Sequence, residues 1–386
     1  RIWAATSKPL PEDLAEVVQR SGLSAEHTRL ASSESDSRSH VSRDEPRRTT
    51  SSSNHPLTPA FETFSISGFA KRNQGVAEVP AHEMELIVAV MQHGTPRDRR
   101  LRATIATTNI LPDSKANRQA ATAAGLLGVL VEILEDHSEG NKRLSRLAVA
   151  CLSNLSAEPS VKDMIAKSGV IPHVTRHLVP SGSKEGRAAS AHAAATLWSL
   201  CIDHAHIKRK IAAEGNTIST LMQLILSSDS AIRTQACGCV GELCVGEDVA
   251  LKDELFKLGA VPLFIASLNQ MDHELQHLAS VAVCNICANN ARNKGAARHF
   301  GAMEAFCRLI KDAQKIDHVR DAAAGGLYNL VSKEDRKMIE ESGVMELLKQ
   351  YPGPHHRLIE RRLLGYSSGA SRPDEEQMSY AGGGGG

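Results

Sequence analysis

The chain has 386 residues, and its 45 Lys and Arg nearly balance its 44 Asp and Glu, so the formal net charge is only +1. This balance and an aromatic content of 3% argue against a strongly basic nucleic-acid binder and against an enzyme built around one large core. Charged residues interrupt every apolar stretch before the roughly 18 residues that a transmembrane helix needs, so we expect no membrane span.

The eight cysteines lie inside apolar segments and lack the spacing of a secreted disulfide framework. We interpret them as reduced thiols, which predicts a location in the cytosol or the nucleus. The chain begins at Arg1 rather than at a methionine, so we expect a fragment or a processed form. An N-terminal targeting signal or lipid anchor ahead of Arg1 therefore stays open.

Residues 1–78 are rich in Ser, Thr, Arg and Pro and hold few apolar residues. Such a segment buries too little apolar surface to offset the entropy of ordering, so we predict a mostly disordered Ser/Arg-rich arm. One short helix is expected over residues 11–23, with acidic residues in its first turn. Residues 47–51 (RRTTS) match a basophilic kinase site, and an ordinary solvated linker explains them equally well.

From residue 79 the pattern changes to helical periodicity with two regular markers. The first marker is a glycine that ends a short helical segment, at Gly125, Gly169, Gly215, Gly259, Gly301 and Gly343, with steps of 42 to 46 residues. The second marks the end of a longer helix, at Asn109-Ile110, Asn154-Leu155, Ser199-Leu200, Glu242-Leu243, Asn285-Ile286 and Asn329-Leu330, with steps of 43 to 45. Two independent markers with one period indicate a repeated structural unit.

Each unit shows the same order of helices. A short helix over residues 161–168 stops at Gly169, because glycine adopts the left-handed conformation at little cost. A second helix follows, with Pro172 in its first turn, and a long third helix is predicted over residues 185–201. No unit buries its apolar face alone, so neighbouring units must stack. The sequence therefore predicts an all-α solenoid with a continuous core.

Four segments carry a more specific resemblance: KSGVIPHVTRHL (167–178), KLGAVPLFIASL (257–268), ACLSNLS (150–156) and AVCNICA (282–288). They resemble the armadillo repeat family over roughly residues 81–350, and HEAT repeats are the alternative because they share the period. The resemblance implies a right-handed α-α superhelix of about six to seven three-helix repeats. We therefore expect a repeat domain over 79–350, a C-terminal capping helix over 351–370 and a flexible tail over 371–386.

Residues 273–277 (HELQH) match the H-E-x-x-H pattern, in which two histidines on one helix bind zinc and the glutamate activates water. Their register is that of an ordinary third-helix start, and the next glutamate that could complete a zinc site is Glu304, one repeat away. We interpret the match as structural. A zinc-dependent hydrolase using His273 and His277 is the alternative from a different class of function.

The pair Cys284 and Cys287 forms a C-x-x-C motif that could hold a metal or a redox pair. However, Cys201, Cys244 and Cys287 all occur two residues after the asparagine position of their repeats. Recurrence in one register indicates a core position for a small apolar side chain, which free cysteine fills well. We therefore predict structural thiols. No glycine-rich phosphate loop is present, and we expect neither a metal nor a cofactor.

The resemblance also implies where a partner binds. In the armadillo family the third helices line a concave groove, and asparagines near their ends bond the backbone of an extended partner chain. The matching residues are Asn109, Asn154, Asn285 and Asn329, while Ser199 and Glu242 replace asparagine in two repeats. A role in capping the helix ends is the alternative for these amides.

Charged residues extend the same stripe back along the third helices. We expect Arg102, Arg143 and Arg146 in the first two repeats, His192 in the next, and Glu242 and Glu274 further along. The groove is thus predicted to be basic at its N-terminal end and acidic past its middle, which would orient an extended ligand. A solvated charged face is the alternative.

Nuclear-import adaptors of this family carry tryptophan four residues before the asparagine. The corresponding positions here are Ile105, Ala150, Ala195, Gly238, Val281 and Gly325. Trp198 lies one residue before Ser199, and we expect it to pack between repeats. We therefore predict a non-enzymatic scaffold for extended segments of other proteins, with a nuclear-transport adaptor as the alternative. Nucleic acid is not an expected partner, and the oligomeric state stays open.

Overall fold

The computed structural model describes residues 64–73, 78–92, 94–180, 182–313, 316–351, 353 and 355–364. Most of the predicted N-terminal arm lies outside these residues, including the expected helix over 11–23 and the RRTTS segment. The predicted tail over 371–386 lies outside them as well.

In the described residues the regular structure is helical, and the α-helices fall into seven successive groups of three. The groups are α3 Ile66–Asn73, α4 Ala81–Met91 and α5 Arg97–Ile110; α6 Lys115–Ala123, α7 Leu126–Glu135 and α8 Lys142–Ser156; α9 Lys162–Lys167, α10 Ile171–Arg176 and α11 Lys184–Cys201; α12 Ala205–Ala212, α13 Thr217–Leu224 and α14 Ser230–Leu243; α15 Val249–Lys257, α16 Ala260–Ser267 and α17 His273–Cys287; α18 Ala291–His299, α19 Ala302–Asp312 and α20 Asp317–Leu330; and α21 Arg336–Ser342, α22 Val344–Gln350 and α23 His356–Leu363. Short 3-10 turns precede α8, α9 and α21 at Glu139–Asn141, Pro159–Val161 and Lys333–Asp335.

The break between the first and second helix of six groups is made by the predicted glycines. All have positive φ angles: Gly125 (82°), Gly169 (80°), Gly215 (48°), Gly259 (88°), Gly301 (80°) and Gly343 (72°). An L-residue with a side chain adopts this left-handed conformation only at a cost, so the glycine series follows from the backbone geometry. The three-helix unit and its glycine marker are confirmed.

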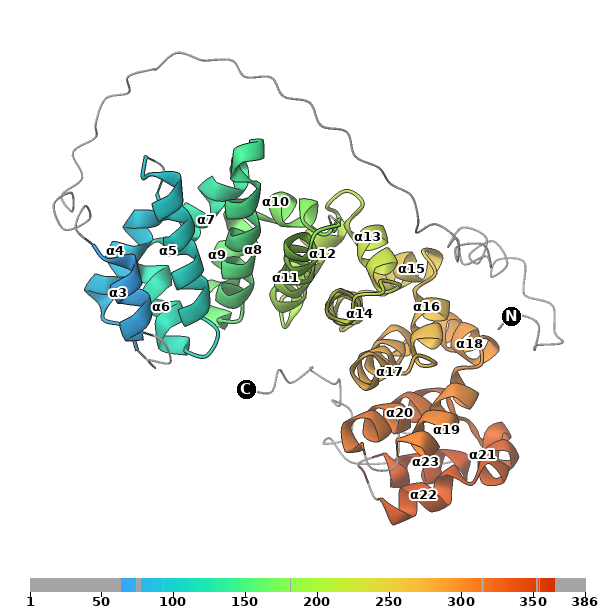
Figure 1. The fold of residues 1–386 in the computed structure, drawn as a ribbon. Coiled ribbons are helices and arrows are strands. Elements are labelled where there is room, and N and C mark those ends of the chain that lie inside the picture. The colour runs from blue at the N-terminus through green and yellow to red at the C-terminus, as the bar shows by residue number, and fades with distance from the viewer. Residues whose placement is uncertain are drawn as a thin grey trace.

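The groups stack into a curved solenoid. Each third helix contacts the third helices of its neighbours, in the order α5, α8, α11, α14, α17 and α20. Figure 1 shows the resulting arc, in which α11, α14, α17 and α20 follow the inner side while α13, α15 and α18 lie on the outer side. One cluster of buried apolar residues runs along the array from Phe69 in α3 to Leu363 in α23. The predicted all-α superhelix with a continuous core is confirmed.

The array begins earlier than the predicted boundary at residue 79. Helix α3 lies within the segment predicted to be mostly disordered, yet Phe69 is completely buried and α3 packs against α5. Ser and Gly in FSISGFAKRN give a weak helix signal, and contact with α5 overrides this weak propensity. At the other end, α23 packs on α20 within the predicted capping segment over 351–370.

Candidate interaction surface

Six third helices carry equivalent register positions near their C-terminal ends, at Asn109, Asn154, Ser199, Glu242, Asn285 and Asn329. Their exposure differs, although the sequence markers are in register. Asn109 is exposed, Asn154, Ser199 and Asn329 are half-buried, and Asn285 and Glu242 are buried. The inner surface therefore does not carry an uninterrupted row of free amides.

Three of these side chains join neighbouring repeats. The amide Nδ2 of Asn154 donates to the carbonyl oxygen of Thr108 at 3.1 Å, and that of Asn329 donates to the carbonyl of Cys284 at 3.5 Å. The hydroxyl of Ser199 donates to the carbonyl of Ser156 at 2.7 Å. These bonds connect third helices across repeats, which differs from capping their own helix. Nδ2 of Asn329 also donates to Sγ of Cys284 at 2.8 Å, so of the two amides it is Asn154 that keeps a second N–H with which to bond another chain's backbone.

Asn285 is placed differently from the prediction. Its side chain is only 8% exposed, and its Nδ2 is buried without a hydrogen-bond partner among the described residues. A buried donor without an acceptor costs about 1–3 kcal/mol, so this amide is a source of local strain. Its amide nitrogen does not contribute to the open surface.

Glu242 corrects the predicted acidic half of the groove. Its carboxylate Oε1 lies 2.8 Å from the Nζ of Lys208 in α12, and both side chains are less than a tenth exposed. Lys208 also donates to the carbonyl of Val245, just past the end of α14, at 3.2 Å. Glu242 thus belongs to an internal ion pair and adds no negative charge to the inner surface.

Lysines from the first helices hold the ends of the third helices, and sequence analysis missed them. Lys162 donates to the carbonyl of Ile202 at 3.4 Å, and Lys252 donates to that of Ala288 at 2.9 Å. A cation at this point complements the partial negative charge of a helix C-terminus. Burial lowers the pKa of Lys162 and of Lys252. The steps of 46 and 44 between Lys162, Lys208 and Lys252 were the signal available in the sequence.

The starts of the third helices are also joined across repeats. Arg187 of α11 forms an ion pair with Asp229 at 3.4 Å, and Arg233 of α14 forms one with Asp272 at 2.7 Å. Asp229 and Asp272 are the N-cap residues of α14 and α17: Asp229 accepts from two backbone N–H groups of α14, and Asp272 accepts from that of Leu275. The same aspartates therefore cap one helix and anchor the preceding one, which fixes the spacing of the inner surface.

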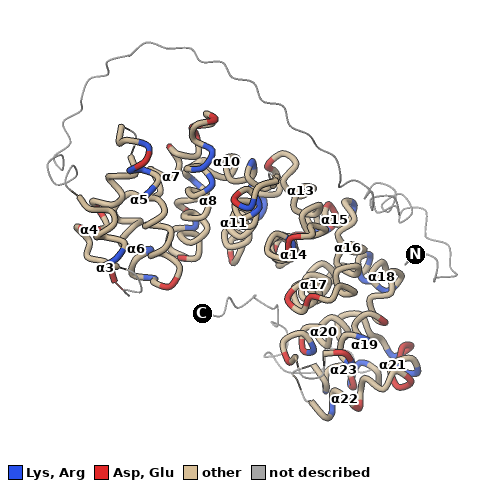
Figure 2. The backbone as a smooth tube through the Cα atoms, viewed as in Figure 1, with Lys and Arg blue, Asp and Glu red and all other residues tan. Residues whose placement is uncertain are grey.

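The three predicted arginines of the groove differ in exposure. Arg102 is exposed and pairs with Asp98 on its own helix, Arg143 is exposed, and Arg146 is half-buried. The net charge of the third helices falls steadily along the array, from +3 in α5 and α8 to +1 in α11, zero in α14 and −1 in α17 and α20. Figure 2 shows Lys and Arg grouped along α8, near α10.

His192 and Glu274 complete the set of predicted groove residues. His192 is half-buried in α11, and burial lowers its pKa, so its imidazole is neutral at pH 7. Glu274 is exposed in the first turn of α17. The structure therefore places charge at the surface in Arg102, Arg143 and Glu274.

Trp198 packs between repeats as predicted. A Cβ atom added to Gly238 in α14 would lie 2.6 Å from atoms of the Trp198 ring. The glycine therefore makes room for an indole from the neighbouring third helix, at the register position where the import adaptors carry their own tryptophan.

The HELQH residues engage in local contacts. Nδ1 of His273 lies 3.1 Å from Oε1 of Gln276, and Nδ1 of His277 lies 3.1 Å from the carbonyl oxygen of His318 in the next repeat. Among the residues that the structure describes, no three His, Cys, Asp or Glu side chains are grouped so that they could hold a metal ion.

The cysteines occupy the core positions that their register predicted. Cys201, Cys244 and Cys287 are completely buried, and none of the eight cysteines forms a disulfide. Burial raises the pKa of Cys151 and of Cys244 to about 12. These thiols are protonated at neutral pH and act as small apolar side chains.

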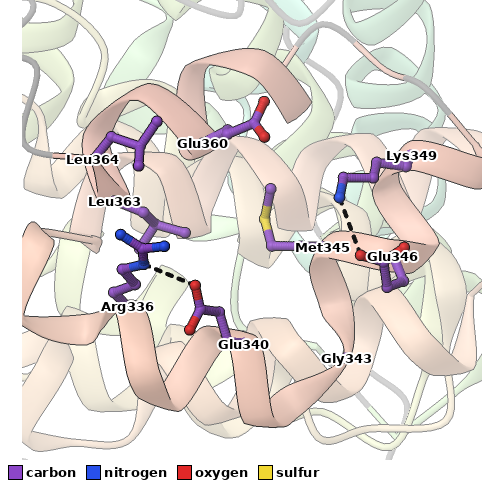
Figure 3. Close-up of a pocket in the computed structure, with 9 residues that line it drawn as sticks. All are labelled: Arg336, Glu340, Gly343, Met345, Glu346, Lys349, Glu360, Leu363 and Leu364. Carbon is purple, nitrogen blue, oxygen red and sulfur yellow. Dashed lines mark hydrogen bonds and ion pairs between the residues drawn. The ribbon is translucent and has the colours of Figure 1, made fainter.

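A pocket of about 230 Å³ lies in the last group of helices, between α21, α22 and α23 (Figure 3). Its apolar wall includes Leu363 and Leu364. Two of its charged side chains, Arg336 and Lys349, already pair with Glu340 and Glu346 at 2.7 and 3.0 Å. Its polar groups bind one another, so we do not place the functional site here.

No protein-family model matches the chain. Among curated proteins, the chain is 28% identical to importin subunit alpha-1b of Oryza sativa subsp. japonica over 172 residues, which is 42% of this chain and 32% of that protein. It is 23% identical to vacuolar protein 8 of Candida albicans over 202 residues, which is 52% of this chain and 33% of that protein. The matches span about a third of the length of these relatives.

Solved structures show the same fold. An engineered protein matches with a TM-score of 0.63 at 21% identity, over 77% of this chain and 73% of that one. A designed armadillo repeat protein in complex with the peptide (KR)4 matches with a TM-score of 0.56 at 19% identity, over 64% of this chain and 100% of that one. No helix in the described part of the chain has the length and apolar character needed to cross a membrane. The glycine-marked three-helix units, their stacking and these similarities together show that the chain has the armadillo-type repeat fold.

Proposed function

We propose that the chain is a non-enzymatic scaffold that holds an extended segment of a partner protein along the inner face of the arc. The observation that carries the proposal is the unbroken succession of third helices, α5, α8, α11, α14, α17 and α20, in one register. Such a surface presents equivalent positions at a regular spacing, which suits an extended chain better than a compact ligand. The designed relative in complex with (KR)4 supports peptide binding by this fold.

The net charge of the first third helices supports an acidic partner segment. Helices α5 and α8 each carry a net charge of +3, so a Lys/Arg-rich segment would meet repulsion at this end. This favours a general interaction scaffold over the nuclear-transport adaptor that the similarity to importin subunit alpha-1b suggests. Exposed Arg102 and Arg143 attract the partner's acidic end, while the second N–H of Asn154 bonds its backbone.

The test is selection from a library of displayed peptides on the whole chain, followed by affinity measurements with one selected peptide. We expect selected peptides to be enriched in Asp and Glu toward one end. The R102E/R143E variant should bind the peptide at least about tenfold more weakly, which corresponds to roughly 1.4 kcal/mol. The matched control is K167E/K257E, which reverses two exposed lysines on the first helices α9 and α15 and should leave the affinity unchanged. Equal affinity of both variants for the peptide would refute the inner-face model.

A further inference from the structure

A second group of basic side chains lies where α8 meets α10 and the turn that follows α7. Arg176 donates from Nη1 to Nε2 of His137, and the rings of His137 and His173 are 5.4 Å apart between centroids. Nε2 of His177 lies 2.8 Å from Oγ of Ser145 in α8. We call His137, His173, His177, Arg146 and Arg176 the Arg/His cluster.

The Arg/His cluster brings arginines close to histidines, which carry positive charge when they are protonated. Arg176 has an imidazole nitrogen of His137 as its partner, which is a weaker acceptor than the carboxylate that usually pairs with a guanidinium. Burial and then the charge of Arg146 and Arg176, with His137, lower the pKa of His177 to about 4. Burial, Arg176 and His137 also lower the pKa of His173, while Glu135 acts in the opposite direction. Burial first, and then their cationic neighbours, therefore favour the neutral form of His173 and His177.

The cluster is open to a ligand. Arg176 and His137 are exposed, and His173 is half-buried. Nδ1 of His173 is itself buried, and the backbone of Leu134 is the polar group that acts on this ring. An anion placed among these groups would accept hydrogen bonds from Arg176 and would offset the positive charge that acts on His173 and His177.

We propose that the Arg/His cluster binds a phosphate monoester, presented by a phosphorylated serine or threonine of a partner segment. Arg176 of α10 bonds His137 in the turn after α7, the His137 ring lies against that of His173, and the charges of Arg146 and Arg176 both act on His177. Each imidazole becomes a double donor when it is protonated. A phosphate dianion supplies the two charges and three acceptor oxygens that this set requires, whereas a carboxylate supplies one charge and two oxygens. The proposal deepens the scaffold function, since Arg146 also belongs to the predicted groove stripe.

The experiment follows the histidine ring signals of the whole chain by NMR while two probes are titrated separately. One probe is inorganic phosphate, and the other is a short Gly/Ala peptide with one phosphoserine; the same peptide without phosphate is the control. We expect saturable shifts of the His173 and His177 signals and a higher pKa of His177 in the bound state. R176Q should weaken binding at least about tenfold, because it removes a charged donor. R209Q, at an exposed arginine that pairs with Asp248 in another repeat, should not.

Each outcome decides the proposal. No saturable shift with either probe, or equal binding by R176Q and the native chain, would overturn it. Tighter binding of the phosphopeptide than of inorganic phosphate supports a segment as the source of the group, and equal binding supports the site with the phosphate group alone as its ligand. The R102E/R143E and K167E/K257E variants test the groove separately. Equal affinity of these two variants for the selected peptide, with intact phosphate binding at the Arg/His cluster, would reject the scaffold model and not this site.

Discussion

The buried ion pair between Lys208 and Glu242 makes a sharp prediction about stability. In K208M the carboxylate of Glu242, only 7% exposed, loses the Lys208 donor at 2.8 Å. Leaving one charge of a buried pair without its partner costs about 3–5 kcal/mol. The converse variant, E242Q, should cost less, about 1–3 kcal/mol, because Lys208 keeps the carbonyl of Val245 as a second acceptor.

The double variant K208M/E242M distinguishes the cost of removing one partner from the net contribution of the ion pair to stability. Two apolar side chains of similar volume remove both desolvated charges, so its stability should lie within about 1 kcal/mol of the native chain or above it. Because a repeat array unfolds unit by unit, the measurement is amide hydrogen exchange in α14 rather than one global melting curve. A K208M penalty below about 1 kcal/mol, or a double variant as unstable as K208M, would refute this account.

Three further predictions follow from the packing and from the titrating groups. Gly238→Ala should lower the melting temperature, at a cost of about 1–3 kcal/mol, because its methyl would lie 2.6 Å from the Trp198 ring. Adding W198L to the Gly238→Ala chain should restore most of the loss, and melting curves of the native chain and the two variants check this. The pKa of His177 lies near 4 in the folded chain and near 6.5 when the chain is unfolded, so between these values the unfolded state binds more protons than the folded state. The contribution of the neutral His177 side chain to the free energy of unfolding is therefore complete above about pH 6.5 and is lost as the pH falls toward 4. Denaturation at several pH values should show this slope, and H177N should flatten it. Burial raises the pKa of Cys151 to about 12 and that of the half-buried Cys284 to about 11. The native chain should therefore resist a thiol reagent until it unfolds. Rapid labelling of Cys151 in the native state would contradict its placement in the core.

The repeat architecture was predictable because its signals are local. A glycine that ends a short helix has to adopt a positive φ, and Gly125 or Gly259 does so whatever its neighbours are. Since the unit recurs with a fixed period, one correct assignment places all the others. Helix α3 was not predicted because Phe69 is buried by packing against another helix, and the sequence of its own segment does not indicate that contact.

The surface was harder to predict because its chemistry depends on long-range partners. Glu242 has the same register position as Asn154, yet it forms a buried ion pair with Lys208 of α12. Arg176 and His137 are 39 residues apart and meet only when repeats stack. The sequence identifies which positions face inward, while the structure shows which of their polar groups are already bonded.

The central claim, that a partner segment lies along the inner face, is tested most directly by photo-crosslinking with a selected acidic peptide. A photoreactive residue is placed at Ser153 in α8, at Val281 in α17, or at Met164, which is 48% exposed on the first helix α9. We expect crosslinks from Ser153 to the acidic end of the peptide, from Val281 to its other end, and none from Met164. Crosslinks from Met164 with none from Ser153 or Val281 would contradict the proposed binding face.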